Sequence, residues 1–108
     1  MESEEVPELT NGEFEKFFKK EGLLFIDFFG EWCMPCVMMG PVIEDLAEEF
    51  KEEVSFAKVN IDDSPEIAQK FDVSVVPTFI ILREGKVLEI ISGSRTQEEL
   101  GDLIKKHL

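Results

Sequence analysis

The sequence predicts a single α/β domain in which a central mixed β-sheet is flanked by helices on both faces. The chain has 108 residues, of which 44% are hydrophobic, and this length suits one domain with a real core. Apolar runs of strand length alternate along it with segments whose apolar residues recur at helical spacing. Residues 83–86 read as a hairpin turn, so the strands on either side should pair antiparallel and make the sheet mixed.

The first elements are expected to be a short edge strand and a helix. Residues 6–9 fit an edge strand, the one place where the missing N–H of Pro7 does no harm. Phenylalanines then recur at i, i+3 and i+4 within residues 14–18, which predicts a helix that Gly22 ends.

The middle of the chain should supply two central strands joined by a helix. Leu23–Phe29 is apolar on both sides, as expected for a strand covered by helices on both faces. A helix should run from Cys36 to about residue 50, with Met38 and Met39 packing in the core or at its rim. Residues 54–61 read as a second central strand.

The C-terminal part completes the order βαβαβαββα. A helix should begin at Ser64, with a proline at its first position. Strands 79–82 and 87–91 should form the hairpin. The last helix should be capped by Ser94 or Thr96.

The two cysteines of the chain, Cys33 and Cys36, stand three residues apart where the strand Leu23–Phe29 gives way to a helix. Positions i and i+3 of a helix share a face, so the two sulfurs can meet. At the helix N-terminus the dipole favours the thiolate of Cys33, whereas Cys36 should be more covered and slower to ionise. The pair suits a dithiol that attacks with Cys33 and resolves with Cys36.

Asp27 is the one charged residue within the apolar strand. Burial should raise the pKa of its carboxyl group. One interpretation is a satisfied structural aspartate. The other is a proton acceptor for Cys36, because Asp27 precedes Cys33 by six residues and can lie beneath the dithiol.

Lys58 is the one charged residue in the second central strand, and it shares a face with Phe56 and Asn60. The strand pattern alone predicts that it extends its amine to solvent at the strand end.

The motif Trp32-Cys33-Met34-Pro35-Cys36, with Pro41 five residues later, resembles the active site of the thioredoxin family. A C-x-x-C pair alone also serves zinc and haem sites, but the tryptophan and the two prolines make this match specific. Val76-Pro77-Thr78 resembles another motif of the family, in which the proline is cis and faces the dithiol. The resemblance covers nearly the whole chain and implies the thioredoxin fold for residues 1–108.

The resemblance also implies an activity, that of a protein disulfide reductase with a redox-active disulfide and no bound cofactor. Cys33 would be the nucleophile, Cys36 the resolving thiol and Asp27, paired with Lys58, the proton acceptor. An apolar rim would bind the substrate and consist of Trp32, Met34, Pro35, Val76, Pro77 and Gly93. Implied partners are disulfide-containing proteins and a thioredoxin reductase, and we expect a monomer.

Three positions depart from the family pattern. Met34 stands where glycine is usual, Val37 where lysine is frequent, and Phe29 where tryptophan is usual. The residues between the cysteines set the redox potential, so the direction of catalysis is less fixed than the dithiol chemistry. The retained Pro35 and a cytosolic setting favour a reductant.

The net charge and the N-terminal residues limit the possible partners and the cellular compartment. A charge of −13 repels nucleic acid and anionic membranes, so we expect neither as a partner. Residues 1–5 are acidic and lack the features of a signal peptide, and no apolar run reaches the roughly 18 residues of a membrane span. We therefore predict a cytoplasmic protein, in which a close cysteine pair is catalytic or metal-binding.

Two alternatives remain open. A binding module could use the surface between Trp32 and Pro77 without turnover, with an inert dithiol. A metal site would have two thiolates and the distant His107, so a closed tetrahedral site would need the cysteine pairs of two chains.

Overall fold

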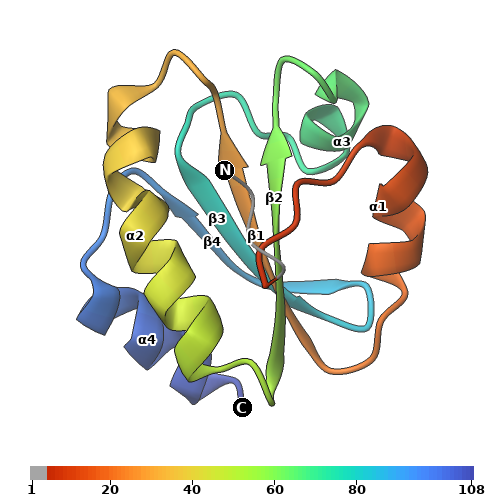
Figure 1. Cartoon of the computed structure of the whole chain (residues 1–108). Coiled ribbons are helices and arrows are strands. Elements are labelled where there is room, and N and C mark those ends of the chain that lie inside the picture. Colours follow the sequence, from red (N-terminus) through yellow and green to blue (C-terminus); the bar gives the residue numbers. More distant parts are fainter. Residues whose placement is uncertain (1–4) are drawn as a thin grey trace.

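In the computed structural model, which describes residues 5–108, a four-stranded sheet lies between two pairs of helices (Figure 1). Helices α2 and α4 cover one face, and α1 and α3 cover the other. The predicted acidic N-terminus lies outside the described residues except for Glu5. The elements follow the order α1 (Asn11–Phe18), β1 (Leu23–Phe29), α2 (Met34–Glu49), β2 (Val54–Asn60), α3 (Pro65–Lys70), β3 (Thr78–Arg83), β4 (Lys86–Ser92) and α4 (Gln97–Lys106).

The sheet has the strand order β2-β1-β3-β4. Strand β1 pairs parallel with β2 and antiparallel with β3, and β3 pairs antiparallel with β4, so the predicted mixed sheet is confirmed. The prediction of β2 as a central strand is wrong, because β2 is the outermost of these four strands. Within residues 5–108, an isolated bridge on its outer side pairs it with the segment before α1.

The predicted first strand, residues 6–9, is also wrong as a strand. It makes a single parallel bridge between Glu8 and Lys58. Lys58 N donates to Pro7 O and Leu9 N donates to Lys58 O, both at 2.9 Å. Pro7 has no N–H to extend this ladder, and α1 begins at Asn11, so pairing stops after one bridge. The observed order is therefore αβαβαββα.

Helix α1 is shorter than predicted. It ends at Phe18 rather than near Gly22, and Lys20 N bonds to Phe17 O at 3.0 Å in a tighter turn. Gly22, at φ +85°, then turns the chain into β1, a conformation that glycine adopts without steric cost.

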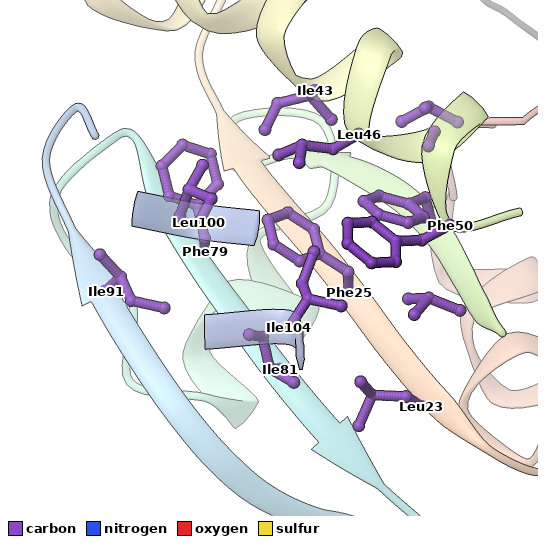
Figure 2. Close-up of a cluster of buried hydrophobic side chains, with 14 of the residues drawn as sticks. Leu23, Phe25, Ile43, Leu46, Phe50, Phe79, Ile81, Ile91, Leu100 and Ile104 are labelled. Carbon is purple, nitrogen blue, oxygen red and sulfur yellow. The ribbon is translucent and has the colours of Figure 1, made fainter. Parts of the chain in front are cut away.

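Strand β1 divides its side chains between two buried cores, because successive residues point to opposite faces. Leu24, Ile26 and Phe28 pack on the side of α1 and α3. Leu23 and Phe25 pack on the side of α2 and α4, where Phe25 stacks on Phe56 with ring centroids 4.9 Å apart. Figure 2 shows this second core, whose labelled members outside the strands are Ile43, Leu46, Phe50, Leu100 and Ile104. The same alternation places the next residue, Asp27, beneath α2.

No helix within residues 5–108 is both long and apolar enough to cross a bilayer.

Candidate active site

Cys33 is the N-cap residue of α2, and the helix begins at Met34 rather than at the predicted Cys36. Strand β1 ends at Phe29, and Cys33 N bonds back to Gly30 O at 3.1 Å, which closes a tight turn before the helix. The backbone of Cys33 is extended, and its Sγ accepts a hydrogen bond from Cys36 N at 3.2 Å. The sulfur therefore takes the place of the oxygen that a serine or aspartate would offer to a free N–H of the first turn.

Cys33 and Cys36 form a disulfide, with their Cα atoms 5.3 Å apart. Both residues are buried, with 4% of Cys33 and 8% of Cys36 exposed. The prediction that Cys36 is the more covered cysteine is wrong for this oxidised form. The bond holds the two sulfurs together against the first turn of α2, so neither side chain reaches out.

Asp27 lies on the α2 side of β1, with Lys58 of β2 as its neighbour across the strands. Its carboxyl group is buried, and Oδ1 has no hydrogen-bonding partner among the described residues. Burial raises the pKa of Asp27 to about 7, and the positive charge of Lys58 opposes part of that rise. An acid with this pKa changes its protonation state near neutral pH.

A pocket of about 370 Å³ connects Asp27 with one of the two cysteines. Asp27, Cys36 and Lys58 all line it, and Val37 and Gly40 of α2 form part of its wall. Cys33 is not among its lining residues. The two cysteines therefore differ in surroundings more than in exposure: Cys36 shares a cavity with a carboxyl group, and Cys33 caps the helix.

The predicted pairing of Lys58 with Asp27 is not a direct ion pair. No nitrogen–oxygen contact within 4.0 Å joins these two described residues, and Lys58 Nζ instead lies 5.6 Å from the centroid of the Phe29 ring. A cation over an aromatic face is partly stabilised there. Lys58 therefore acts on Asp27 through its charge at a distance.

Trp32 is held in place by two residues that the sequence interpretation missed. Its indole Nε1 donates a hydrogen bond to Asp62 Oδ2 at 2.7 Å. A Cβ atom on Gly30 would lie 2.8 Å from Trp32 Cε2, so only glycine leaves room for the ring in this position. The glycine two residues before the tryptophan was the available signal for this close approach.

The Val76–Pro77 peptide bond is cis, as the resemblance implied. Pro77 O accepts a hydrogen bond from Gly93 N at 2.8 Å, which brings together two of the predicted rim residues. Gly93 has φ +90°, where a side chain would be strained. Trp32, Met34 and Pro35 stand exposed beside the disulfide in the chain.

This geometry agrees with the comparisons. The family model described as Thioredoxin matches residues 5–106. The chain belongs to the thioredoxin family. It is 40% identical to the thioredoxin of Listeria monocytogenes over 95% of this chain and 99% of that protein. It is 46% identical to the thioredoxin of Chlamydia trachomatis over 80% and 83% of the two chains.

A solved structure extends the likeness to three dimensions. It comes from a study of the thiol resolving mechanism in yeast mitochondrial 1-Cys peroxiredoxin via glutathione/thioredoxin systems. That chain superposes with a TM-score of 0.85 and 34% identity over 94% of each chain. The thioredoxin fold predicted from the sequence is thus confirmed.

Membership in the thioredoxin family fixes the class of chemistry. Thioredoxins are thiol–disulfide oxidoreductases, and Cys33–Cys36 is the redox-active pair of this chain. The disulfide is part of the protein, so the family's exchange reaction needs no cofactor. Residues 5–108 contain no group of three or more His, Cys, Asp or Glu side chains that could hold a metal ion. The Nε2 atom of His107 instead lies 2.7 Å from Oε2 of Glu89.

Proposed function

We propose that this protein acts as a cytoplasmic protein disulfide reductase, with Cys33 as nucleophile and Cys36 as resolving thiol. The observation that carries the proposal is the unequal setting of the two sulfurs. Cys33 Sγ receives an N–H of the first turn of α2, whereas Cys36 shares a pocket with Asp27. A helix N-terminus and a donated hydrogen bond both stabilise a thiolate.

In the first step, the Cys33 thiolate of the reduced protein attacks one sulfur of a substrate disulfide. A mixed disulfide forms between Cys33 and the substrate, and the other substrate sulfur leaves as a thiolate. In the second step, the thiol of Cys36 gives its proton to the Asp27 carboxylate, directly or through water, and the resulting thiolate attacks Cys33 Sγ. The Cys33–Cys36 disulfide forms and the substrate leaves with both sulfurs reduced, so two electrons have moved.

Asp27 and Lys58 tune the second step. A carboxyl group with a pKa of about 7 is ionised in part of the molecules at neutral pH and can accept the proton of Cys36. Without the charge of Lys58 the pKa of Asp27 would lie higher still, and the carboxylate form would be rarer. Lys58 is therefore a positioning residue that acts through Asp27.

The substrate would bind at the rim formed by the predicted set, of which only Pro77 is buried. In this proposal Trp32, Met34 and Pro35 would lie on one side of the disulfide, and Val76, Pro77 and Gly93 would lie on the other. An extended substrate segment pairing with the backbone of Val76 would be recognised mainly by its main chain. Such recognition suits many different proteins, so the substrate range should be broad.

The proposed partners are disulfide-containing proteins and a thioredoxin reductase that restores the dithiol. Both follow from membership in the family. The net charge of −13 supports a protein that avoids nucleic acid and anionic membranes and works as a monomer. Pro35 between the cysteines favours reduction over oxidation. The direction is testable, since about 30 mV in potential corresponds to about 1.4 kcal/mol.

The experiment that tests the proposal is covalent trapping with a matched pair of variants. Cys36→Ser keeps the nucleophile but removes the resolving thiol, so mixed disulfides should accumulate with many proteins of a cell lysate. Dithiothreitol should release all of them. Cys33→Ser should trap few. One partner held by both variants and insensitive to dithiothreitol would instead identify a binding module, and no covalent capture by either variant would refute the reductase.

A further inference from the structure

One face of α2 exposes an apolar stripe that begins at the disulfide. Met34, Val37 and Met38 are 66%, 58% and 70% exposed, and Pro41 is exposed on the same side. Their spacing of i, i+3, i+4 and i+7 puts them on one helix face. Met39, which the sequence interpretation grouped with Met38, points the other way and is buried in the core. Most of the apolar surface of the stripe is therefore open to solvent, although Val37 also lines the pocket that holds Asp27.

The same helix face becomes acidic further from the disulfide. Asp45 follows Met38 by seven residues, two turns along the helix, and Glu48 follows Asp45 by three. Both are exposed. Seven residues of helix rise about 10 Å, so a carboxylate stands about that far beyond the methionine. Glu48 already pairs with Lys51 at 3.3 Å, which leaves Asp45 as the more available charge.

We propose that the α2 stripe, defined as Met34, Val37, Met38 and Pro41, together with Asp45 beyond it, is a docking surface for protein substrates. Its occupant is a segment of the substrate that carries apolar side chains next to the disulfide and lysine or arginine about 10 Å further on. This proposal rests on the proposed function, because the reactive disulfide is what brings the substrate to the start of the stripe.

Two observations favour such a partner. The stripe is continuous with the site of exchange, so any protein whose disulfide reaches Cys33 must lie close to Met34 and can extend along α2. Methionine side chains are flexible and polarisable, so they adapt to apolar surfaces of different shapes. The acidic end then selects by charge. A second copy of this chain is disfavoured as occupant, since each copy carries a net charge of −13.

The test uses three synthetic peptides that share one disulfide-closed ring and differ in a helical arm. The first arm has leucines near the ring and lysines two turns further on. In the second arm glutamates replace the lysines, and in the third serines and glycines replace all of these residues. The reduced protein should show kcat/KM about tenfold higher for the leucine–lysine arm than for the serine–glycine arm, a difference of about 1.4 kcal/mol. The glutamate arm should fall below the lysine arm, and added salt should narrow that gap.

Ratios between peptides isolate docking from the chemistry of the sulfurs. Met38→Ser should reduce the preference for the leucine–lysine arm over the serine–glycine arm about threefold or more. Asp45→Lys should abolish or reverse the preference for lysine over glutamate. The matched controls are Val87→Ser in β4 and Glu84→Lys in the turn between β3 and β4. In the sheet register both sites are level with the start of β1, whereas the disulfide follows its end. Both controls should keep the wild-type ratios.

Equal kcat/KM for the three peptides, or ratios that the Met38 and Asp45 variants leave unchanged, would overturn the docking surface while the reductase stands. Sedimentation of the wild-type protein as a dimer that Met38→Ser dissociates would also overturn it, in favour of a second copy as occupant. If the protein reduced none of the peptides and no small disulfide such as hydroxyethyl disulfide, the proposed function itself would fail.

Discussion

Helices α2 and α4 pack on the same face of the sheet, but their N-termini serve different purposes. Helix α4 starts with a capping box: Thr96 Oγ1 accepts a hydrogen bond from Glu99 N at 3.0 Å, and Glu99 Oε1 accepts one from Thr96 N at 2.9 Å. Glu98 and Glu99 add negative charge to the first turn. Free N–H groups and the helix dipole are both compensated, which stabilises the helix.

Helix α2 has neither device. Its cap is the sulfur of Cys33, a weaker acceptor than an oxygen, and no acidic residue lies in its first turn. Pro35 and Cys36 take the places that Glu98 and Glu99 occupy in α4. The positive end of the dipole is therefore left for the sulfur. The chain thus gives up helix stability at the one N-terminus where it needs a reactive thiolate.

The largest effect should come from replacing the α2 cap by a better one. Cys33→Ser should lower disulfide reductase activity by at least about 10³-fold, because a serine hydroxyl does not replace the nucleophile. Serine is a preferred N-cap residue, so urea unfolding should find the variant as stable as the reduced wild-type protein or up to about 1 kcal/mol more stable. A variant that unfolds more easily would contradict the view that this cap is chosen for reactivity.

The buried carboxyl group of Asp27 beneath α2 also lowers the stability of the folded protein, and Asp27→Asn should remove this effect. The pKa of Asp27 rises from 3.8 when unfolded to about 7 when folded, so the folded state binds its proton more tightly. Stability is therefore lost as pH rises from about 4 to 7, and the loss approaches roughly 4 kcal/mol above pH 7. Urea unfolding of the oxidised proteins should show Asp27→Asn up to about that much more stable at pH 8, with little gain at pH 4.

The same variant should slow the resolving step near neutral pH, because the proton acceptor for Cys36 is gone. Stopped-flow release of a substrate from the mixed disulfide would measure it. Rates identical to wild type from pH 6 to 9 would return Asp27 to a structural role.

At the other N-terminus, Thr96→Ala should cost stability without touching activity. Loss of the cap hydrogen bond typically destabilises a protein by about 0.5–2 kcal/mol. Thermal unfolding would show the loss, and reduction of a protein disulfide should proceed at the wild-type rate. A slower rate would mean that α4 supports the site more directly than the comparison assumes.

The smallest effect tests the dipole itself. Met34→Glu gives the first turn of α2 an acid, as α4 has. An acid there is worth about 0.3–1 kcal/mol to the helix and competes with the Cys33 thiolate for the same dipole. Alkylation of Cys33 at neutral pH should slow about two- to fivefold, with Met34→Gln as the uncharged control. Equal rates in the two variants would contradict the electrostatic argument.

Local sequence signals predicted much of this architecture. The apolar run of β1, interrupted only by Asp27, marked an inner strand, and the tryptophan and prolines around Cys33 and Cys36 located the site. Asp27 stood out because a charge inside an apolar strand is costly. Each of these signals reports the residue's own surroundings, and each was confirmed in position.

Features that depend on distant packing were missed. The sequence predicts a strand at residues 6–9 because it does not show which backbone groups face the neighbouring strand. In the structure the missing N–H of Pro7 limits the pairing to a single bridge, between Glu8 and Lys58. The separation of Lys58 from Asp27 depends on where a long side chain turns, here toward Phe29. The bond of Trp32 to Asp62 joins positions 30 residues apart, and neither residue alone announces it. Met38 is exposed and its neighbour Met39 is buried. Which of the two faces the core depends on the orientation of α2 about its axis, which the sequence alone does not give.

The central claim is that the N-terminus of α2 makes Cys33, and not Cys36, the reactive sulfur, although both are buried in the disulfide. The most direct measurement is peptide mapping of the reduced protein after limiting iodoacetamide at pH 7. The account predicts label on Cys33 first, with Cys36 modified only after longer exposure. Label on Cys36 first, or at equal rates on both, would contradict it.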